Sequence, residues 1–141
     1  EFMRGVPAAN SAGNSGGCSW VMAMDLFKRS PVALIGIDFG YPEGTPLETT
    51  QYYSSMLREA KGDVRIIKEA YKEFYHPVFK ERAYVDLVFY HYREAFISMQ
   101  QENALWYKLY GGTKNCTEGG TLFGVGIDCM RFKDFLEKWK K

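Results

Sequence analysis

The chain has 141 residues, of which 46% are hydrophobic and 16% aromatic. This length and composition are typical of one folded domain and exclude a chain that stays disordered along its whole length. The formal net charge is only +1, from 18 basic and 17 acidic residues, so charge gives no case for nucleic acid as the main partner.

The cysteines predict a reducing environment. Cys18, Cys116 and Cys129 are widely separated and include no C-x-x-C pair, which argues against a disulfide framework and against a cysteine-rich zinc site. The sequence also has no recognisable signal peptide and no apolar run long enough to cross a bilayer. We therefore expect a cytoplasmic protein with neither a membrane nor a nucleic acid as its partner.

Residues 1–16 are predicted to lie outside the folded core. The two residues before Met3 are typical of a cloning remnant, and the segment that follows is small, polar and rich in glycine, as loops are. A single α/β domain is therefore expected to span residues 17–141.

The first predicted elements are a helix and a strand in direct succession. Residues 17–29 are apolar on nearly every side of a helix, so more than one face should be buried. Pro31 ends this helix, because proline cannot continue the hydrogen-bond ladder. Residues 32–37 form a continuous apolar run, typical of a strand covered on both faces in a parallel sheet. Asp38 follows at the strand end, where open α/β sheets bind ligands.

The rest of the chain is predicted to be mainly helical. Apolar side chains follow helical spacing over residues 48–61, 63–75, 84–103 and 130–140. Residues 105–110 are predicted to form a second strand, and residues 111–120 a long turn. These elements predict a Rossmann-like α/β fold of three layers with a small, mainly parallel sheet.

The start of the first predicted helix is a candidate phosphate site. Free N–H groups and the positive end of a helix dipole favour an anion, and glycines let a phosphate or ribose approach the backbone. The alternative is an ordinary N-cap, in which Asn14 or Ser15 bonds the first turn. The segment is not a P-loop, because no Gly-Lys-Ser/Thr follows Gly16 and Gly17.

The end of the predicted strand is a second candidate. Asp38 is suited to a ribose hydroxyl or a metal-bound phosphate, and Tyr41 to stacking on a base; the alternative is an aspartate that caps the next loop. His76 and His91 are candidate general bases, because histidine titrates near neutral pH. The alternative for both is a place on the solvated edge of an amphipathic helix.

A third polar segment lies near the carboxyl end of the chain. Asparagine, threonine and glutamate side chains crowd beside a glycine pair, which suggests a polar site held by a tight turn. A plain loop is the alternative. The residues concerned are Asn115, Thr117, Glu118 and Gly119.

Together, three segments of the sequence resemble one protein family. Residues 14–41 combine a small-residue turn, a helix, an apolar strand and a G-[IM]-D-[FL]-x-Y ending. Residues 84–93 are similar to a Y-x-D-x-x-[FY]-x-x-Y-R pattern, and residues 115–136 to N-x-T-E-G-G-x-x-x-G-x-G-[IV]. In this order they resemble the archaeal 6-hydroxymethyl-7,8-dihydropterin pyrophosphokinase-like proteins. The motility-associated factor glycosyltransferases of bacterial flagellin belong with that family, and small bacterial sialyltransferases share a distantly similar fold.

The resemblance implies a nucleotide-binding transferase domain. In one branch of the family, ATP with Mg²⁺ would pass a diphosphate to a pterin alcohol; in the other, a nucleotide sugar would be the donor. The candidate catalytic residues are Asp38 and Glu118, and no residue is assigned as a metal ligand. It assigns nucleotide binding to Asn14, Ser15, Gly16, Gly17, Tyr41, Asn115, Thr117 and Gly119.

The sequence departs from the family at its beginning. Family members start with an earlier strand and a Gly-Pro-Ser-type phosphate turn, so we expect this chain to be the C-terminal part of an incomplete domain. An exposed strand edge and uncovered helix faces would then favour a homo-oligomer. A second hypothesis is a non-catalytic binding or assembly module that keeps the fold without activity. A third is a metal-dependent hydrolase using Asp38, Glu118 and a histidine, although no metal-ligand spacing supports it.

Overall fold

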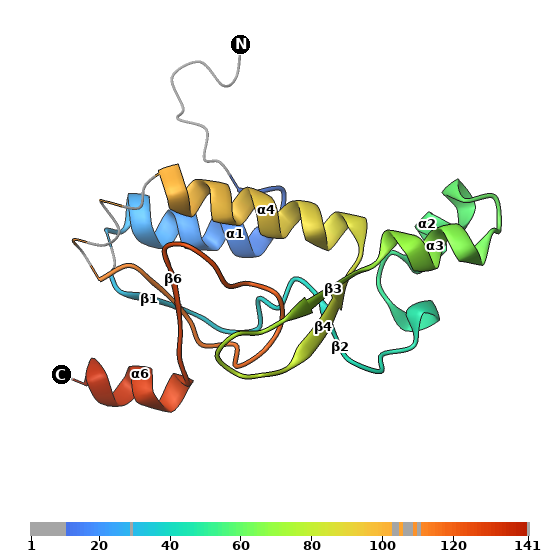
Figure 1. Cartoon of the computed structure of the whole chain (residues 1–141). Coiled ribbons are helices and arrows are strands. Elements are labelled where there is room, and N and C mark those ends of the chain that lie inside the picture. The colour runs from blue at the N-terminus through green and yellow to red at the C-terminus, as the bar shows by residue number, and fades with distance from the viewer. Residues whose placement is uncertain (1–10, 29, 103–104, 106–108, 110, 141) are drawn as a thin grey trace, which may run out of the picture.

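The computed structural model describes residues 11–28, 30–102, 105, 109 and 111–140. In this part of the chain the strands form two three-stranded sheets, one parallel and one antiparallel, with helices packed around them (Figure 1).

The parallel sheet consists of β1 (Val32–Leu34), β5 (Thr113–Asn115) and β6 (Ile127–Cys129). Their order is β1-β5-β6, and both neighbouring pairs are parallel. Because the strands run the same way, their carboxyl ends lie along one edge of the sheet and their amino ends along the other.

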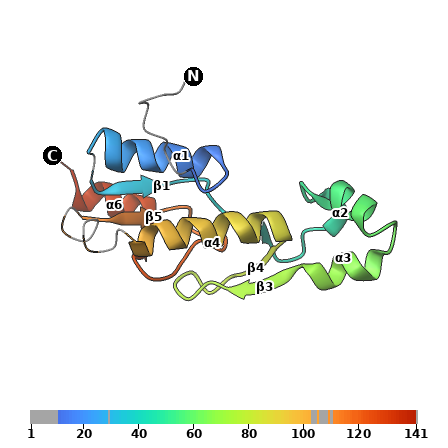
Figure 2. The ribbon, with the colours of Figure 1, turned by 90° about the horizontal axis from the view of Figure 1, so that it is seen from above.

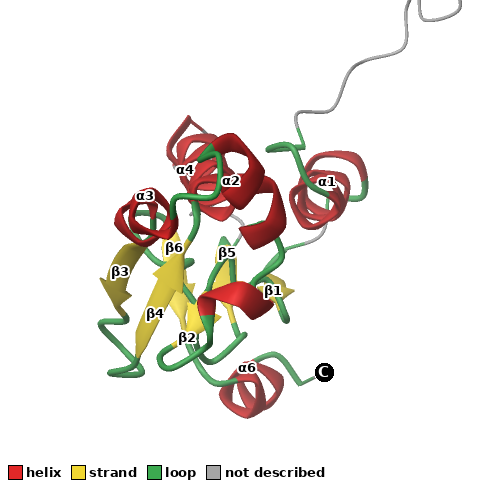
Figure 3. Cartoon of the chain, turned by 90° about the vertical axis from the view of Figure 1, so that its right-hand side faces the viewer, coloured by secondary structure: helices red, strands yellow, loops and turns green. Residues whose placement is uncertain are grey.

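Helices cover both faces of the parallel sheet (Figure 3). One face carries α4 (Leu87–Glu102) and α1 (Ser15–Val21), which continues as the π-helical segment η1 (Met22–Leu26); the other face carries α6 (Phe132–Lys138). This arrangement confirms the predicted three-layer α/β class with a small, mainly parallel sheet. The hydrophobic core includes Trp20, Met24, Leu34, Phe39, Phe96, Met99, Leu122 and Ile127.

The antiparallel sheet and two short helices form the other end of the molecule (Figure 2). Its strands are β2 (Tyr41–Pro42), β3 (Lys72–Tyr75) and β4 (Arg82–Val85), in the order β2-β4-β3. Between β2 and β3 the chain forms the 3₁₀ turn η2 (Leu47–Thr49), α2 (Tyr53–Glu59) and α3 (Val64–Ala70).

The strand predicted at residues 32–37 is shorter than expected and lies at an edge of the sheet. Only its first half forms β1, and β1 is an edge strand, with β5 in the centre. Ile35 is 58% exposed, so the predicted covering of the whole run on both faces is wrong. The chain leaves the sheet through Gly36, whose φ of +69° places it in the left-handed region.

Two of the predicted helices each contain a strand. Residues 72–75 and 82–85 pair as an antiparallel hairpin, so the prediction of helix over 63–75 and from 84 onward is wrong at those positions. Only residues 64–70 and 87–102 are helical there, and within 48–61 the α-helix covers 53–59. His76 is not on the edge of a helix but in the loop between the two strands.

The remaining predictions differ in smaller ways. The first helix begins at Ser15 rather than Gly17, and its exposed Leu26 and Phe27 show that it is not buried on every side. The predicted turn at 111–120 contains β5, and the last helix is shorter than predicted. The strand predicted at 105–110 lies mostly outside the described residues, although Leu105 and Leu109 themselves are helical.

Candidate functional site

A pocket of about 300 Å³ lies where α1 begins and β1 ends. Its wall is formed by residues 14–16 at the start of the helix, by residues 36–40 after the strand, and by Phe89 of α4. The structure therefore brings together two segments that are far apart in the sequence and that both carry predicted site residues.

Asn14 caps α1. Its side-chain Oδ1 accepts the N–H of Gly17 at 2.8 Å, and its carbonyl oxygen accepts the N–H of Cys18 at 3.1 Å. The N-cap interpretation of Asn14 is therefore confirmed. A Cβ atom on Gly17 would overlap the carbonyl oxygen of Ser11, so this position requires glycine for close packing. Gly17 is buried and is not among the residues that line the pocket.

The next two N–H groups of the helix are free. Ser15 and Gly16 precede the first N–H that bonds within the helix, and neither N–H has an acceptor among the described residues. Both residues line the pocket. Unpaired N–H groups at the positive end of a helix dipole attract oxyanions, so this wall of the pocket suits a phosphate or carboxylate.

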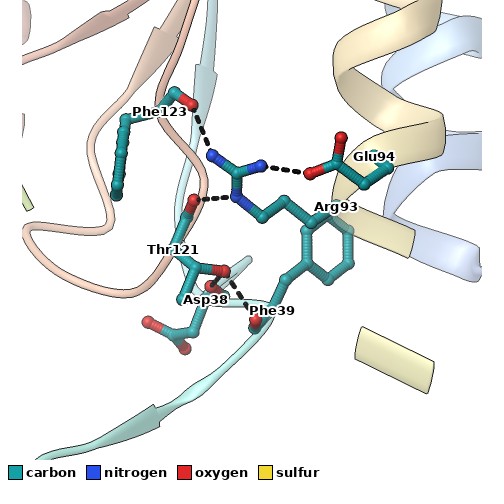
Figure 4. A network of polar contacts seen from close by, with 6 residues as sticks. All are labelled: Asp38, Phe39, Arg93, Glu94, Thr121 and Phe123. Carbon is teal, nitrogen blue, oxygen red and sulfur yellow. Dashed lines mark hydrogen bonds and ion pairs between the residues drawn. The ribbon is translucent and has the colours of Figure 1, made fainter. Parts of the chain in front are cut away.

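Asp38 forms part of the opposite wall, and the loop between β5 and β6 holds its backbone. The carbonyl oxygen of Asp38 accepts the N–H of Thr121 at 2.8 Å, and the Thr121 hydroxyl donates to the Phe39 carbonyl at 2.6 Å. The Asp38 carboxylate points away from these contacts (Figure 4). Partial burial raises the pKa of this carboxyl group, and a hydrogen bond from its own backbone N–H offsets part of the rise.

Arg93 of α4 fixes the same loop and was not predicted as a site residue. Its guanidinium donates from Nε to the Thr121 carbonyl at 2.7 Å and from Nη2 to the Phe123 carbonyl at 3.1 Å (Figure 4). It also pairs with Glu94. An arginine on the core-facing side of an amphipathic helix is the sequence signal for such an anchor, because a buried guanidinium needs several acceptors.

The predicted residues at the end of β5 and directly after it have three different roles. Asn115 is fully buried, and its amide joins the Leu122 carbonyl to the N–H of Thr117 at 2.7 and 3.0 Å. Thr117 reaches the pocket segment, because its Oγ1 accepts the N–H of Ile37 at 3.2 Å. Glu118 accepts the N–H of Phe132 at 3.0 Å, at the start of α6, and does not line the pocket.

Gly119 is buried outside the pocket lining. A Cβ atom there would lie 3.2 Å from the Glu81 carboxylate, which is tighter than an ordinary contact. Within the segment 115–119, therefore, Thr117 is the residue that forms a hydrogen bond to the backbone of the described pocket lining, through Ile37.

Tyr41 is not in the pocket lining, but it packs against Phe89, which is. Its hydroxyl donates to Asp86 at 2.8 Å and accepts the N–H of Gln51 at 3.1 Å, while its ring packs on Phe89 with centroids 5.3 Å apart. Burial and the adjacent Asp86 carboxylate raise the pKa of Tyr41. The fully buried Asp86, which was not predicted as a site residue, also caps α4 by accepting the N–H groups of Val88 and Phe89.

Neither candidate general base lies in the pocket. His76 is buried in the hairpin loop, where its Nδ1 accepts the N–H groups of Val78 and Phe79 at 3.2 Å. Burial lowers the pKa of His76, and the nearby Glu81 carboxylate offsets part of that change. His91 is exposed on α4.

Comparison with known proteins yields no match for this chain. No model of a protein family matches the chain, and no curated protein or solved structure matches it. Among the described residues, none of the helices has both the length and the apolar character that crossing a membrane demands. The same part of the chain contains no group of three or more histidine, cysteine, aspartate or glutamate side chains placed to hold a metal ion.

Proposed function

We propose that the pocket between α1 and β1 binds the phosphate-bearing part of a nucleotide, and that the domain acts as a nucleotide-dependent transferase in the cytoplasm. One observation carries this proposal: Ser15 and Gly16, whose N–H groups have no acceptor among the described residues, line the same pocket as Asp38. A helix start beside a strand end, at the carboxyl edge of a parallel sheet, is where α/β proteins bind phosphorylated ligands.

The residues of the pocket fit a magnesium-bound phosphate. Mg²⁺ is usually held by one or two carboxylates together with substrate phosphates, so a single carboxylate is enough on the protein side. Asp38 would supply that ligand, and a cation beside it would favour the ionised form that burial disfavours. The Ser15 and Gly16 N–H groups would hold the phosphate oxygens, and the metal would supply charge neutralisation.

The volume of the pocket sets how much of the ligand it can enclose. About 300 Å³ is at the lower end of the range for small-molecule sites, which is enough for phosphates and ribose but leaves the base and the acceptor uncovered. Both donors that the family resemblance implies, ATP and a nucleotide sugar, share this phosphate-bearing part. A homo-oligomer would supply further surface for the rest of the ligand.

A non-catalytic binding module is the second candidate function, and the position of Glu118 favours it. Its carboxylate is engaged by the N–H of Phe132 and is absent from the pocket lining. Asp38 is then the one acidic residue in the described lining of the pocket, without a second carboxylate or a histidine for proton transfer.

Titration calorimetry with ATP, GTP, CMP and a CMP-sugar, each with and without Mg²⁺, tests binding. Ser15 is the first residue of α1, a position where proline is tolerated, so Ser15→Pro deletes one free N–H and leaves the helix intact. Asn14 is already extended (φ −145°, ψ 161°), as a residue before proline must be. We expect Ser15→Pro to weaken phosphate binding about tenfold, the loss of one hydrogen bond to a charged group.

The controls separate the two candidate functions. Ser15→Ala keeps the N–H and should bind as the parent does, and Asp38→Asn should remove the Mg²⁺ dependence alone. Turnover of ATP with a pterin alcohol, or of the sugar donor, followed by ³¹P NMR, supports the transferase; binding without turnover supports the module. Absence of heat with every nucleotide, or equal affinity of the proline and alanine variants, would rule out the phosphate site.

A further inference from the structure

A larger pocket lies at the opposite edge of the parallel sheet. Its volume of about 730 Å³ is well within the range of sites that enclose a small organic ligand. The turns that precede β5 and β6 line it, as do α4 and the end of α6, so it lies at the amino ends of the strands. No residue lines both pockets, and the inference below is independent of the proposed nucleotide site.

The innermost polar group of this pocket is incompletely bonded. Gln100 is fully buried, and its Nε2 donates to the Thr113 hydroxyl at 2.7 Å. The same hydroxyl also accepts a hydrogen bond from Trp20 Nε1 at 2.9 Å. The Gln100 Oε1 atom has no hydrogen-bond partner among the residues that the structure describes. Exchanging the amide oxygen and nitrogen would leave Nε2 unpaired instead, so one polar atom of this amide is free in either orientation.

The free end of the amide faces the turn that borders the pocket. A Cβ atom on Gly126 would lie 3.6 Å from Gln100 Oε1, and both residues belong to the pocket lining. Buried polar atoms in folded proteins are nearly always paired, so an unpaired one at the wall of a large pocket points to a partner supplied by a ligand.

The charged residues in the described lining of the pocket, Lys114, Lys138 and Asp128, leave one positive charge in excess. The Lys114 side chain is only 11% exposed and pairs with Asp128, whose side chain is 68% exposed. Lys138 adds a second ammonium group, 4.7 Å from the centre of the Trp139 ring. Because Asp128 can turn into solvent at little cost, Lys114 is available to an incoming anion.

We propose that this pocket binds a planar aromatic carboxylate. The two ammonium groups would hold the carboxylate, Trp139 would contact the ring, and a polar substituent on the ring would bond the free atom of Gln100. The excess of a single positive charge matches one carboxylate, whereas a phosphate dianion would leave the pocket with negative charge in excess beside Asp128. Exposed Leu105 and Val125 in the lining supply the apolar contact that a ring requires.

The test is an NMR titration of the ¹⁵N-labelled full chain with 4-hydroxybenzoate. Three comparison compounds each lack one feature: 4-hydroxybenzamide is neutral, cyclohexanecarboxylate is not planar, and inorganic phosphate has no ring. We expect 4-hydroxybenzoate to shift the resonances of Gly112, Gly126 and the Gln100 side chain, and each comparison compound to bind at least about tenfold more weakly.

Matched variants locate the contacts. Lys138→Gln changes an exposed pocket residue and should weaken binding about five- to tenfold, whereas Lys133→Gln, exposed on the same helix outside the lining, should not. Gln100→Met should weaken binding to a similar degree. Gln101→Met, a substitution at the exposed neighbouring residue, should leave binding unchanged. The proposal is overturned if 4-hydroxybenzoate causes no shifts at millimolar concentration, if the neutral amide binds equally well, if shifts cluster at Ser15 and Asp38, or if Lys138→Gln binds as the parent does.

Discussion

Buried polar side chains hold the loops on which the candidate nucleotide site depends. Asn115 and Arg93 each bond two backbone groups of the segment between β5 and β6, and Thr121 then joins that segment to the Asp38 backbone. Removal of one buried partner leaves the others unpaired, at a cost of about 1–3 kcal/mol for each group. The position of Asp38 therefore depends on residues that do not line its pocket.

His76 should make the stability of the protein depend on pH. The folded state holds the ring neutral with a lowered pKa, whereas the unfolded chain binds a proton near pH 6.5. The free energy of unfolding should therefore fall as the pH drops below 6.5 toward the pKa of the folded state, by up to about 1.4 kcal/mol per pH unit for one proton. Urea denaturation at a series of pH values measures this slope.

Two histidine variants assign that slope. His76→Asn removes the titrating ring and should flatten the dependence just below pH 6.5. His91→Asn replaces the exposed histidine of α4 and should leave it unchanged. If both variants keep the slope of the parent, His76 does not cause it.

At the scale of elements, apolar periodicity located some segments and missed others for identifiable reasons. The start of α1 and the apolar run of β1 follow from a capping residue and from hydrophobicity, and both lie where the pocket forms. The central strand β5 carries Thr113, Lys114 and Asn115, all buried, with bonds to Gln100, Asp128 and Leu122. Because these side chains are polar, the strand gives no hydrophobic signal in the sequence. The partners that let them be buried lie elsewhere in the chain, so the sequence does not show them either.

The hairpin of β3 and β4 was missed for another reason. The apolar residues from Ile66 to Phe74 continue a helical spacing across the end of α3, so periodicity alone does not show where the helix stops. The two strands are defined by pairing, with Phe74 opposite Ala83, and that pairing depends on a loop held by the His76 ring. Tertiary contacts therefore override the local pattern there.

The loop between β5 and β6 should tolerate no side chain at Gly120. Its φ is +74°, and a Cβ atom would lie 2.6 Å from the Asp38 carbonyl oxygen, which is backbone and cannot rotate away. Gly44 has a similar φ of +83° but open space around it, so Gly44→Ala measures the conformational strain alone. We expect Gly44→Ala to cost about 1–2 kcal/mol of folding stability and Gly120→Ala at least about 3 kcal/mol.

Chemical denaturation of both variants measures these costs, and the nucleotide titration adds a second readout. Because Gly120 approaches the Asp38 backbone, any Gly120→Ala protein that folds should also lose nucleotide affinity, whereas Gly44→Ala should not. Equal destabilisation by the two substitutions would mean that the close approach to Asp38 adds nothing to the strain.

For the molecule as a whole, the consequence of this topology is an unpaired edge. β1 has β5 on one side and no strand on the other in the described part of the chain. The N–H of Val32 and the carbonyl of Leu34 bond the segment that contains β5, at 3.2 and 2.9 Å. Since alternate residues of a strand bond opposite neighbours, the N–H and carbonyl of Ala33 face outward. A free edge beside the candidate nucleotide pocket favours pairing with a second copy.

Ala33→Pro tests whether this edge joins two copies. Proline removes the outward N–H and leaves the bonds of Val32 and Leu34 to their neighbouring segment, so the folded monomer should melt within a few degrees of the parent. Light scattering across a concentration series should show a dimer for the parent and for Ala33→Ser, which keeps the N–H, and a monomer for Ala33→Pro. A parent that is monomeric at every concentration would show that this edge does not join two copies. A proline variant that still dimerises would place the association on another surface, with β1 as a free edge in the assembly.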